Sequence, residues 1–240
     1  MAFTNQPQAV EMGVQSQSLP VSMQYLTGLD TIICKQKIEM AEVLTGFETR
    51  NKYGLYNKEG QQIFFVEEQS DAMERCYNPG GRGFNLQVTD NHRLEVMRFT
   101  RDFKWCLNCC CCAGGACQMV INVEHPPGKI IGRVKGADAT CNHHVQLFDA
   151  VDNHKFTIWT TCCPCQDVCC PDDINIPITD PSLTTRVGNI AKQWKGCCRE
   201  AFTDADQFKL TLPADMAIDT KVLLLGALFF VEFLMFEKQQ

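Results

Sequence analysis

The stretch VLLLGALFFVEFLMF, from Val222 to Phe236, decides how the rest of this chain folds. It is apolar on every face, and Glu232 is its only charged residue. An α-helix of this length would be about 22 Å long, which is short of the roughly 30 Å hydrocarbon core of a bilayer. A charged side chain in mid-membrane also costs about 2.5–3.5 kcal/mol. The stretch is therefore either the central helix of a closed barrel, which its length favours, or a transmembrane helix.

The segment before this stretch has the pattern of an all-β domain. Residues 84–88 alternate apolar and polar side chains, Asp90-Asn91 forms a turn, and the alternation resumes at Leu94, which predicts a β-hairpin. Residues 162–182, rich in Cys, Pro and Asp, predict a loop, and residues 183–212 predict one or two more strands. Other apolar or alternating runs are found at residues 63–66, 119–123, 130–134, 145–147 and 156–160. Short strands with regular turn signals predict a barrel or a sandwich, so the expected fold class is mainly β.

The length and composition suit one compact domain with a short tail. The chain has 240 residues, of which 45% are hydrophobic, and this excludes a globally disordered protein. Residues 1–25 are polar and have no hydrophobic period, so we expect a flexible tail followed by one domain over residues 26–238. The net charge of -6 argues against a general nucleic-acid binder, because such proteins usually carry a basic face.

Sixteen cysteines are many for a protein of this length. No secretory signal opens the chain, and Cys109 to Cys112 are consecutive, so a disulfide framework is not expected. The thiols are then free, metal-bound or acylated. Cys106 with Cys109, and Cys162 with Cys165, are two C-x-x-C pairs whose thiolates would complete a tetrahedral zinc site if the two loops met.

Four segments together resemble the phospholipid scramblase family and follow one another in that family's order. They are LTGFETRNKYG (44–54), CLNCCCC (106–112), GNIAKQWKG (188–196) and REAFTDADQFKLTLPAD (199–215). The resemblance covers residues 24–238 and implies a tubby-like fold, a twelve-stranded closed β-barrel around a hydrophobic C-terminal helix. Descriptions of the family also treat the terminal stretch as a single-pass transmembrane helix, so both interpretations stay open.

The resemblance implies bidirectional movement of phospholipids between membrane leaflets, triggered by calcium and independent of ATP. No covalent bond changes in such a process, so we expect neither catalytic residues nor an enzyme. The alternative is a membrane-associated adaptor or regulator with the same barrel, which binds lipid, protein or DNA without moving lipid. Burial of the terminal helix would favour this alternative, because a buried helix does not span a bilayer.

The segment DADQFKLTLPAD is the candidate Ca²⁺ site, as the resemblance implies. Calcium prefers six to eight oxygen ligands, and the segment supplies three carboxylates and otherwise backbone carbonyls. The candidate ligands are Asp204, Asp206, Phe208, Leu210, Leu212 and Asp215. Lys209 stands where an EF-hand loop needs glycine, so we expect weak binding, toward the 10⁻⁴–10⁻³ M end of the calcium range. The same residues also fit a plain amphipathic strand that leads to Pro213.

The first cysteine cluster is the candidate membrane anchor. The resemblance implies palmitoylation of this cluster, beside the hydrophobic Trp105, and two or more acyl chains anchor a protein stably. The candidate positions are Cys106, Cys109, Cys110, Cys111 and Cys112. Zinc binding and ordinary loop thiols are the alternatives. Acylation would place the protein at the cytoplasmic face of the plasma membrane, in contact with membrane phospholipids.

Two short motifs bear on protein partners. GNIAKQWKG resembles the family's nuclear-import segment, so Lys192, Trp194 and Lys195 are candidates for contact with an importin-type receptor when the protein is not acylated. Import signals usually have a denser basic run, so an ordinary strand or turn is the alternative. The N-terminal tail contains only Pro7 and Pro20, so it has no ligands for SH3 or WW domains.

Overall fold

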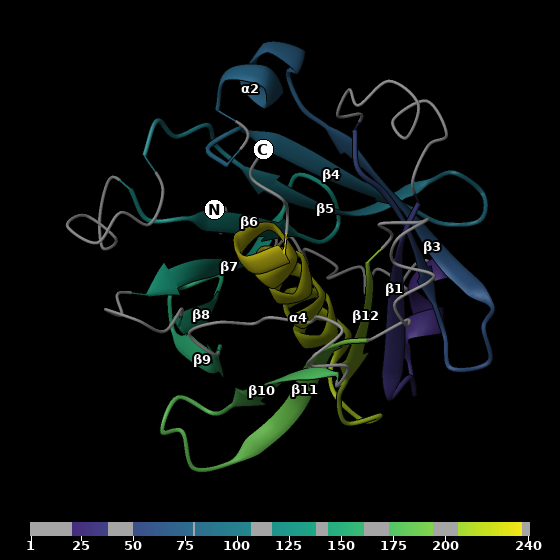
Figure 1. The fold of residues 1–240 in the computed structure, drawn as a ribbon. Helices are drawn as coiled ribbons and strands as arrows, with labels where there is room; N and C mark the ends of the chain where they lie inside the picture. The colour runs from purple at the N-terminus through teal and green to yellow at the C-terminus, as the bar shows by residue number, and fades with distance from the viewer. Residues whose placement is uncertain are drawn as a thin grey trace, which may run out of the picture.

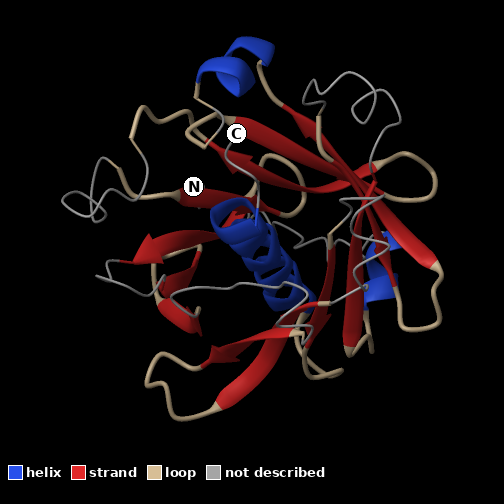
Figure 2. Ribbon diagram, in the orientation of Figure 1, coloured by secondary structure: helices blue, strands red, loops and turns tan. Residues whose placement is uncertain are grey.

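The computed structural model describes residues 21–37, 50–78, 80–106, 117–137, 144–160, 173–193 and 206–236. Within these ranges twelve strands form one closed antiparallel barrel (Figures 1 and 2). Each strand pairs with the strands before and after it in the sequence, and β1 closes the barrel by pairing with β12. The prediction of a mainly β fold, a closed barrel around a C-terminal helix, is confirmed.

All twelve strands precede the terminal helix in the sequence. The strands are β1 (Thr31–Lys37), β2 (Lys52–Tyr56), β3 (Gln62–Gln69), β4 (Phe84–Thr89), β5 (Glu95–Arg101), β6 (Val120–Glu124), β7 (Ile130–Ala137), β8 (His144–Asp149), β9 (His154–Trp159), β10 (Ile174–Thr179), β11 (Arg186–Lys192) and β12 (Gln207–Thr211). The helices are the 3₁₀ helix η1 (Val21–Leu26), α2 (Ala72–Tyr77), α4 (Ile218–Val231) and the π-helical turn η2 (Glu232–Phe236).

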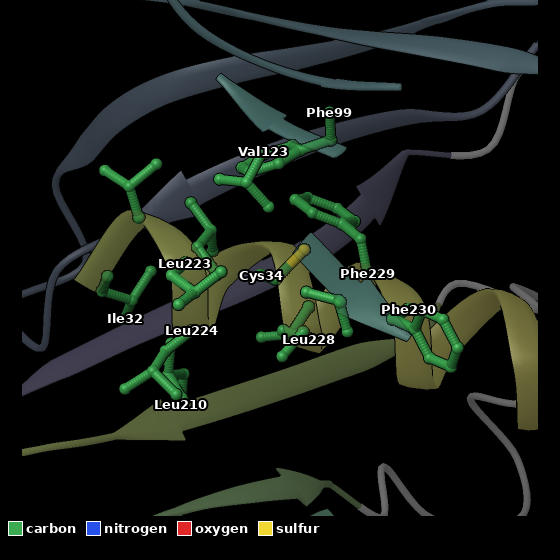
Figure 3. Packing of buried hydrophobic residues seen from close by; sticks show 14 of the residues in the cluster. Ile32, Cys34, Phe99, Val123, Leu210, Leu223, Leu224, Leu228, Phe229 and Phe230 are labelled. Carbon is green, nitrogen blue, oxygen red and sulfur yellow. The ribbon is translucent and has the colours of Figure 1, made fainter. Parts of the chain in front are cut away.

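Helix α4 runs through the ring of strands (Figure 1). Every residue from Lys221 to Val231 is buried, because the strands turn alternate apolar side chains toward the helix. Figure 3 shows side chains of α4 packed among those of the surrounding strands, with Ile32 and Cys34 from β1, Phe99 from β5, Val123 from β6 and Leu210 from β12. The core-helix interpretation is therefore correct for this stretch. In the part of the chain that the structure describes, no helix is both long enough and apolar enough to cross a bilayer.

The two ends of the barrel differ in their connections, which alternate between the ends because neighbouring strands are antiparallel. We call one the short-turn end. Its turns are residues 57–61, 90–94, 125–129, 150–153 and 180–185, and residues 212–217 there lead into α4. We call the other end the long-connection end. The strand ends found there are joined by residues 38–51, 70–83, 102–119, 138–143, 160–173 and 193–206. Helix α4 begins at the short-turn end and ends at the long-connection end.

Several element boundaries differ from those predicted. Strand β10 lies in a range predicted as loop, where Pro177 argues against a strand. The proline is tolerated because β10 pairs with β9 only at Ile178 and Thr179, which leaves Pro177 on an edge. The predicted tail ends before residue 25, since η1 begins at Val21 and the side chain of Met23 is fully buried. Helix α4 begins four residues before the predicted Val222, and α2 was not predicted.

Gly226 allows α4 to lie directly against the barrel wall, and its replacement tests this packing. A Cβ at this position would lie 2.6 Å from Cγ2 of Val123 and 3.3 Å from Cδ1 of Phe99. We predict that Gly226→Ala lowers the free energy of unfolding by about 1–3 kcal/mol, despite the roughly 1 kcal/mol that alanine gains in helix propensity. Urea denaturation measures the change.

Val123→Ala is the control for this prediction. It removes the clashing methyl groups, so the double variant is expected to be less destabilised than the sum of the two single variants. An additive double variant, or a stabilising Gly226→Ala, would contradict the close packing of α4 on β6.

Candidate functional site

Four of the predicted site residues that the structure describes lie at the two ends of the barrel, and the other three lie along or just after β12. Cys106, Lys192 and Asp206 lie at the long-connection end, next to the ends of β5, β11 and β12. Asp215 lies at the short-turn end, just before α4. The remaining candidates, Cys109, Cys110, Cys111, Cys112, Trp194, Lys195 and Asp204, lie outside the described residues.

The candidate Ca²⁺ ligands that the structure describes, which exclude Asp204, do not form a single loop-type site. Phe208, Leu210 and Leu212 direct their side chains into the core, and β12 pairs with β1 on one side and β11 on the other, so its backbone belongs to the sheet. Five strand residues at about 3.3 Å each separate Asp206 from the turn that holds Asp215. Ca²⁺ holds its oxygen ligands at about 2.3–2.6 Å, so these two carboxylates cannot share one ion. For residues 207–211 the amphipathic-strand interpretation is the correct one.

Asp206 is paired with Lys192, a residue predicted for another function. Nζ of Lys192 lies 2.9 Å from Oδ1 of Asp206, and the two side chains are only 15% and 24% exposed. The same ammonium lies over the ring of Phe236, 4.4 Å from its centroid. Lys192 therefore joins the end of β11 to the residue before β12 and to η2.

The cysteine prediction needs one correction. Cys106 and Cys117 form a disulfide that closes the connection between β5 and β6. Those strands are neighbours, so their ends bring the two residues together although eleven positions separate them. A sulfur in a disulfide cannot carry a thioester or ligate zinc, so Cys106 is unsuited to either role in this state. Among the described residues, no three His, Cys, Asp or Glu side chains are grouped so as to hold a metal ion.

Lys221 is a buried charge near the start of α4 that the sequence interpretation did not assign. Its ammonium donates to the backbone carbonyls of Leu26, Leu29 and Ala214, at 2.9, 2.8 and 2.8 Å. Burial lowers the pKa of Lys221, and nearby carboxylates partly offset this effect. The three hydrogen bonds tie α4 to η1 and to the turn before the helix, which explains why a cation is tolerated in the core.

Glu232 is the matching buried charge where α4 ends. The Tyr53 hydroxyl lies 2.8 Å from both carboxylate oxygens of Glu232 and donates to that carboxylate. Burial, together with the negative charge of Glu232, raises the pKa of the Cys34 thiol well above its ordinary value. Cys34 is therefore a neutral core side chain and not a nucleophile.

A buried arginine cluster holds η2 at the long-connection end. Nε of Arg82 donates to Glu68 at 2.9 Å, and the Arg101 guanidinium donates twice to the Arg82 carbonyl. Both guanidinium groups lie over the ring of Phe233, which also stacks on Phe84. Burial alone would raise the pKa of Glu68, but the hydrogen bonds and charge of Arg82 outweigh burial and hold that pKa below its ordinary value.

A cavity of about 650 Å³ lies at the short-turn end, beside the first turns of α4. Its lining carries charges of both signs, from Lys129, Lys155, Asp149 and Asp219. Asp219 bonds Nδ1 of His125 at 2.9 Å, so the first turn of α4 is attached to the β6–β7 turn. None of the predicted site residues lies in this lining.

Comparison with known proteins relates the whole barrel to one family. The family model described as Scramblase matches residues 10–238. Phospholipid scramblase 1 of Rattus norvegicus is 36% identical over 91% of this chain and 63% of its own length, and the Homo sapiens protein of that name is 36% identical over 91% and 66%. Phospholipid scramblase 2 of Bos taurus is 34% identical over 91% and 72%. The chain thus spans just under two thirds of the scramblase 1 relatives, and no solved structure matches it significantly.

The Lys192–Asp206 pair is expected to contribute measurably to stability. Because both side chains are mostly buried, a double-mutant cycle with Lys192→Met and Asp206→Asn should give a coupling of about 1 kcal/mol in urea denaturation. Lys58 and Asp30 form the control pair, at 3.6 Å with about half of each side chain exposed, and should couple more weakly. Equal coupling in the two pairs would contradict the structural role of Lys192.

Proposed function

This chain belongs to the scramblase family, and on that premise we propose that it moves phospholipids between the two leaflets of a membrane. The movement is bidirectional and needs no ATP, because lipids then pass down their own concentration gradients. The observation that supports this function is the extent of the family match, which includes every strand of the barrel, α4 and η2. No covalent step is involved, so the proposal assigns no catalytic residue.

We further propose that Ca²⁺ acts at the long-connection end through Asp206 and the neighbouring Asp204. Asp206 lies at the rim of the barrel, where Lys192 already neutralises its charge. A Ca²⁺ ion bound there would displace the Lys192 ammonium, which also contacts Phe236 at the end of η2. Ion binding would thereby affect the last turn of the helix without a loop-type site. Asp215 has no part in this proposal.

Membrane attachment is proposed to come from acyl chains on Cys109, Cys110, Cys111 and Cys112. Two or more chains anchor a protein stably, and these residues belong to the connection between β5 and β6 at the long-connection end. This arrangement would hold the barrel at the cytoplasmic leaflet of the plasma membrane. Import into the nucleus would depend on Trp194 and Lys195, since the side chain of Lys192 is engaged with Asp206.

A membrane-associated adaptor is the second candidate function. One specific observation favours it: α4 fills the barrel, so the apolar stretch that would otherwise insert into lipid is already buried by protein. Such a protein would bind lipid, protein or DNA through its surface and would not move lipid. The two functions predict opposite results in a transport assay.

The assay uses the purified full-length protein in liposomes whose two leaflets contain a fluorescent phospholipid. Scrambling exposes inner-leaflet probe to an external quencher, so we predict faster and more complete quenching with Ca²⁺ and without ATP. Asp206→Ala should abolish the response to Ca²⁺, whereas Asp215→Ala, at the other end of β12, should retain it.

Two outcomes of this assay would overturn the assignments. Quenching no faster than in protein-free liposomes would reject lipid transport in favour of the adaptor. Equal loss of the Ca²⁺ response in Asp206→Ala and Asp215→Ala would reject the proposal that Ca²⁺ acts at the long-connection end alone.

A further inference from the structure

Three of the most exposed large apolar side chains lie together at the long-connection end. Trp105 is 85% exposed, Tyr77 78% and Met73 62%. Met73 and Tyr77 belong to α2, a helix that contributes no buried residue, so packing in the core does not explain their presence. We call these three side chains the interfacial patch. Figure 1 shows α2 beyond the start of β4, outside the ring of strands.

Hydrogen bonds between the segment that follows α2 and Lys104 hold Tyr77 and Trp105 near each other. Asn78, which follows α2, donates from its side-chain amide to the carbonyl of Lys104 at 2.9 Å. The amide of Lys104 in turn donates to the carbonyl of Gly81 at 2.8 Å. Phe103 packs its ring edge-on against that of Trp105, with centroids 5.1 Å apart. Tyr77 and Trp105 are thus the immediate neighbours of two residues that are bonded to each other.

Specific hydrogen bonds stabilise helix α2 within the connection between β3 and β4. Asp71 caps its first turn by accepting from the amides of Met73 and Glu74, and Glu74 accepts from the amide of Gly83. A Cβ at Gly81 would overlap the Lys104 carbonyl, so this glycine allows the close approach of the two segments. The exposed side chains are therefore presented in a defined position.

We propose that the interfacial patch docks the barrel on a phospholipid surface. Tryptophan and tyrosine combine an apolar ring with one polar atom, which suits them to the headgroup boundary of a bilayer. The residues beside the patch carry both signs of charge, with Arg75 and Lys104 near Asp71, Glu74 and Asp102. A protein partner would use the same apolar area. Failure of the wild-type protein to bind vesicles would favour such a partner over a lipid surface.

The distribution of charge supports this orientation. Among the described residues of the short-turn end, carboxylates outnumber basic side chains. The carboxylates there are Asp30, Glu59, Asp90, Asp152, Asp180, Asp215 and Asp219, against Lys58, Arg93 and Lys129. The described connections at the opposite end carry Asp71, Glu74, Asp102, Asp173 and Asp206, against Arg50, Arg75, Arg82 and Lys104. That end, where the patch lies, is closer to neutral, so an anionic leaflet repels it less.

The patch also lies close to the proposed lipid anchor, and this step of the inference rests on the proposed function. Cys109 follows Trp105 by four residues, a span of at most about 14 Å. Acyl chains at residues 109–112 would enter the bilayer beside the patch, so the two would act as joint membrane signals. The patch would then set the orientation of the barrel, and the acyl chains would prevent its release.

Vesicle co-sedimentation of the unacylated full-length protein tests the patch alone. The probe is a vesicle of phosphatidylcholine with a minor fraction of phosphatidylserine. The triple variant Met73→Ser, Tyr77→Ser, Trp105→Ser is expected to bind at least about tenfold more weakly than the wild type. Because all three side chains are exposed and outside the core, its unfolding midpoint in urea should not change.

The matched control is Leu94→Ser with Val151→Ser. These side chains are 64% and 77% exposed, but they lie at the short-turn end, so vesicle binding should be unchanged. Absence of wild-type binding, equal binding by the triple variant, or an equal loss in the control would overturn the docking proposal. A wild-type protein that binds vesicles through the patch but moves no lipid would instead reject the transport function and leave the patch intact.

Discussion

The rest of the structure depends on the burial of α4 inside the barrel. Eight strands enclose a space that side chains alone can fill, whereas a ring of twelve is wider and needs further apolar volume. A helix that is apolar on all faces supplies this volume, and each large side chain that it buries stabilises the fold by about 1.5–3 kcal/mol. Barrel and helix therefore require each other: without the helix the barrel would be hollow, and without the barrel the helix would expose its entire surface.

Two buried charges determine the depth of the helix in the barrel. Lys221 is bonded near the start of α4 and Glu232 where it ends, and they are eleven residues, or about 16 Å, apart along the helix. Each has its hydrogen-bond partners in the observed position, and an unpaired buried charge is strongly destabilising. Sliding the helix by one turn, about 5.4 Å, would separate both charges from these partners. These polar contacts specify one position, whereas apolar packing alone would tolerate several.

Local patterns in the sequence were sufficient for much of the fold but for little of the site. Apolar alternation identified the β4–β5 hairpin, and the length of the terminal stretch favoured a core helix. Pro177 favoured the prediction of a loop at β10, because nothing in the local sequence indicates which side of a strand lacks a partner. The Glu232–Tyr53 bond joins residues 179 positions apart, and the Cys106–Cys117 disulfide depends on which strand ends are neighbours. Asp206 and Asp215 matched a linear motif, but the strand between them separates them in space.

The features proposed to act on lipid all lie at the long-connection end of the barrel. They are the end of α4, the β5–β6 connection with its cysteines, Asp206 and the interfacial patch. The central claim is that α4 stays inside the barrel when the protein is on a membrane. Photolabelling with a phospholipid that carries a photoreactive group at the end of an acyl chain, followed by mass-spectrometric mapping, tests this most directly. The account predicts labels at the long-connection end and none within residues 222–231. Labels along Val222–Val231 would show that the helix leaves the barrel for lipid, and would contradict the account.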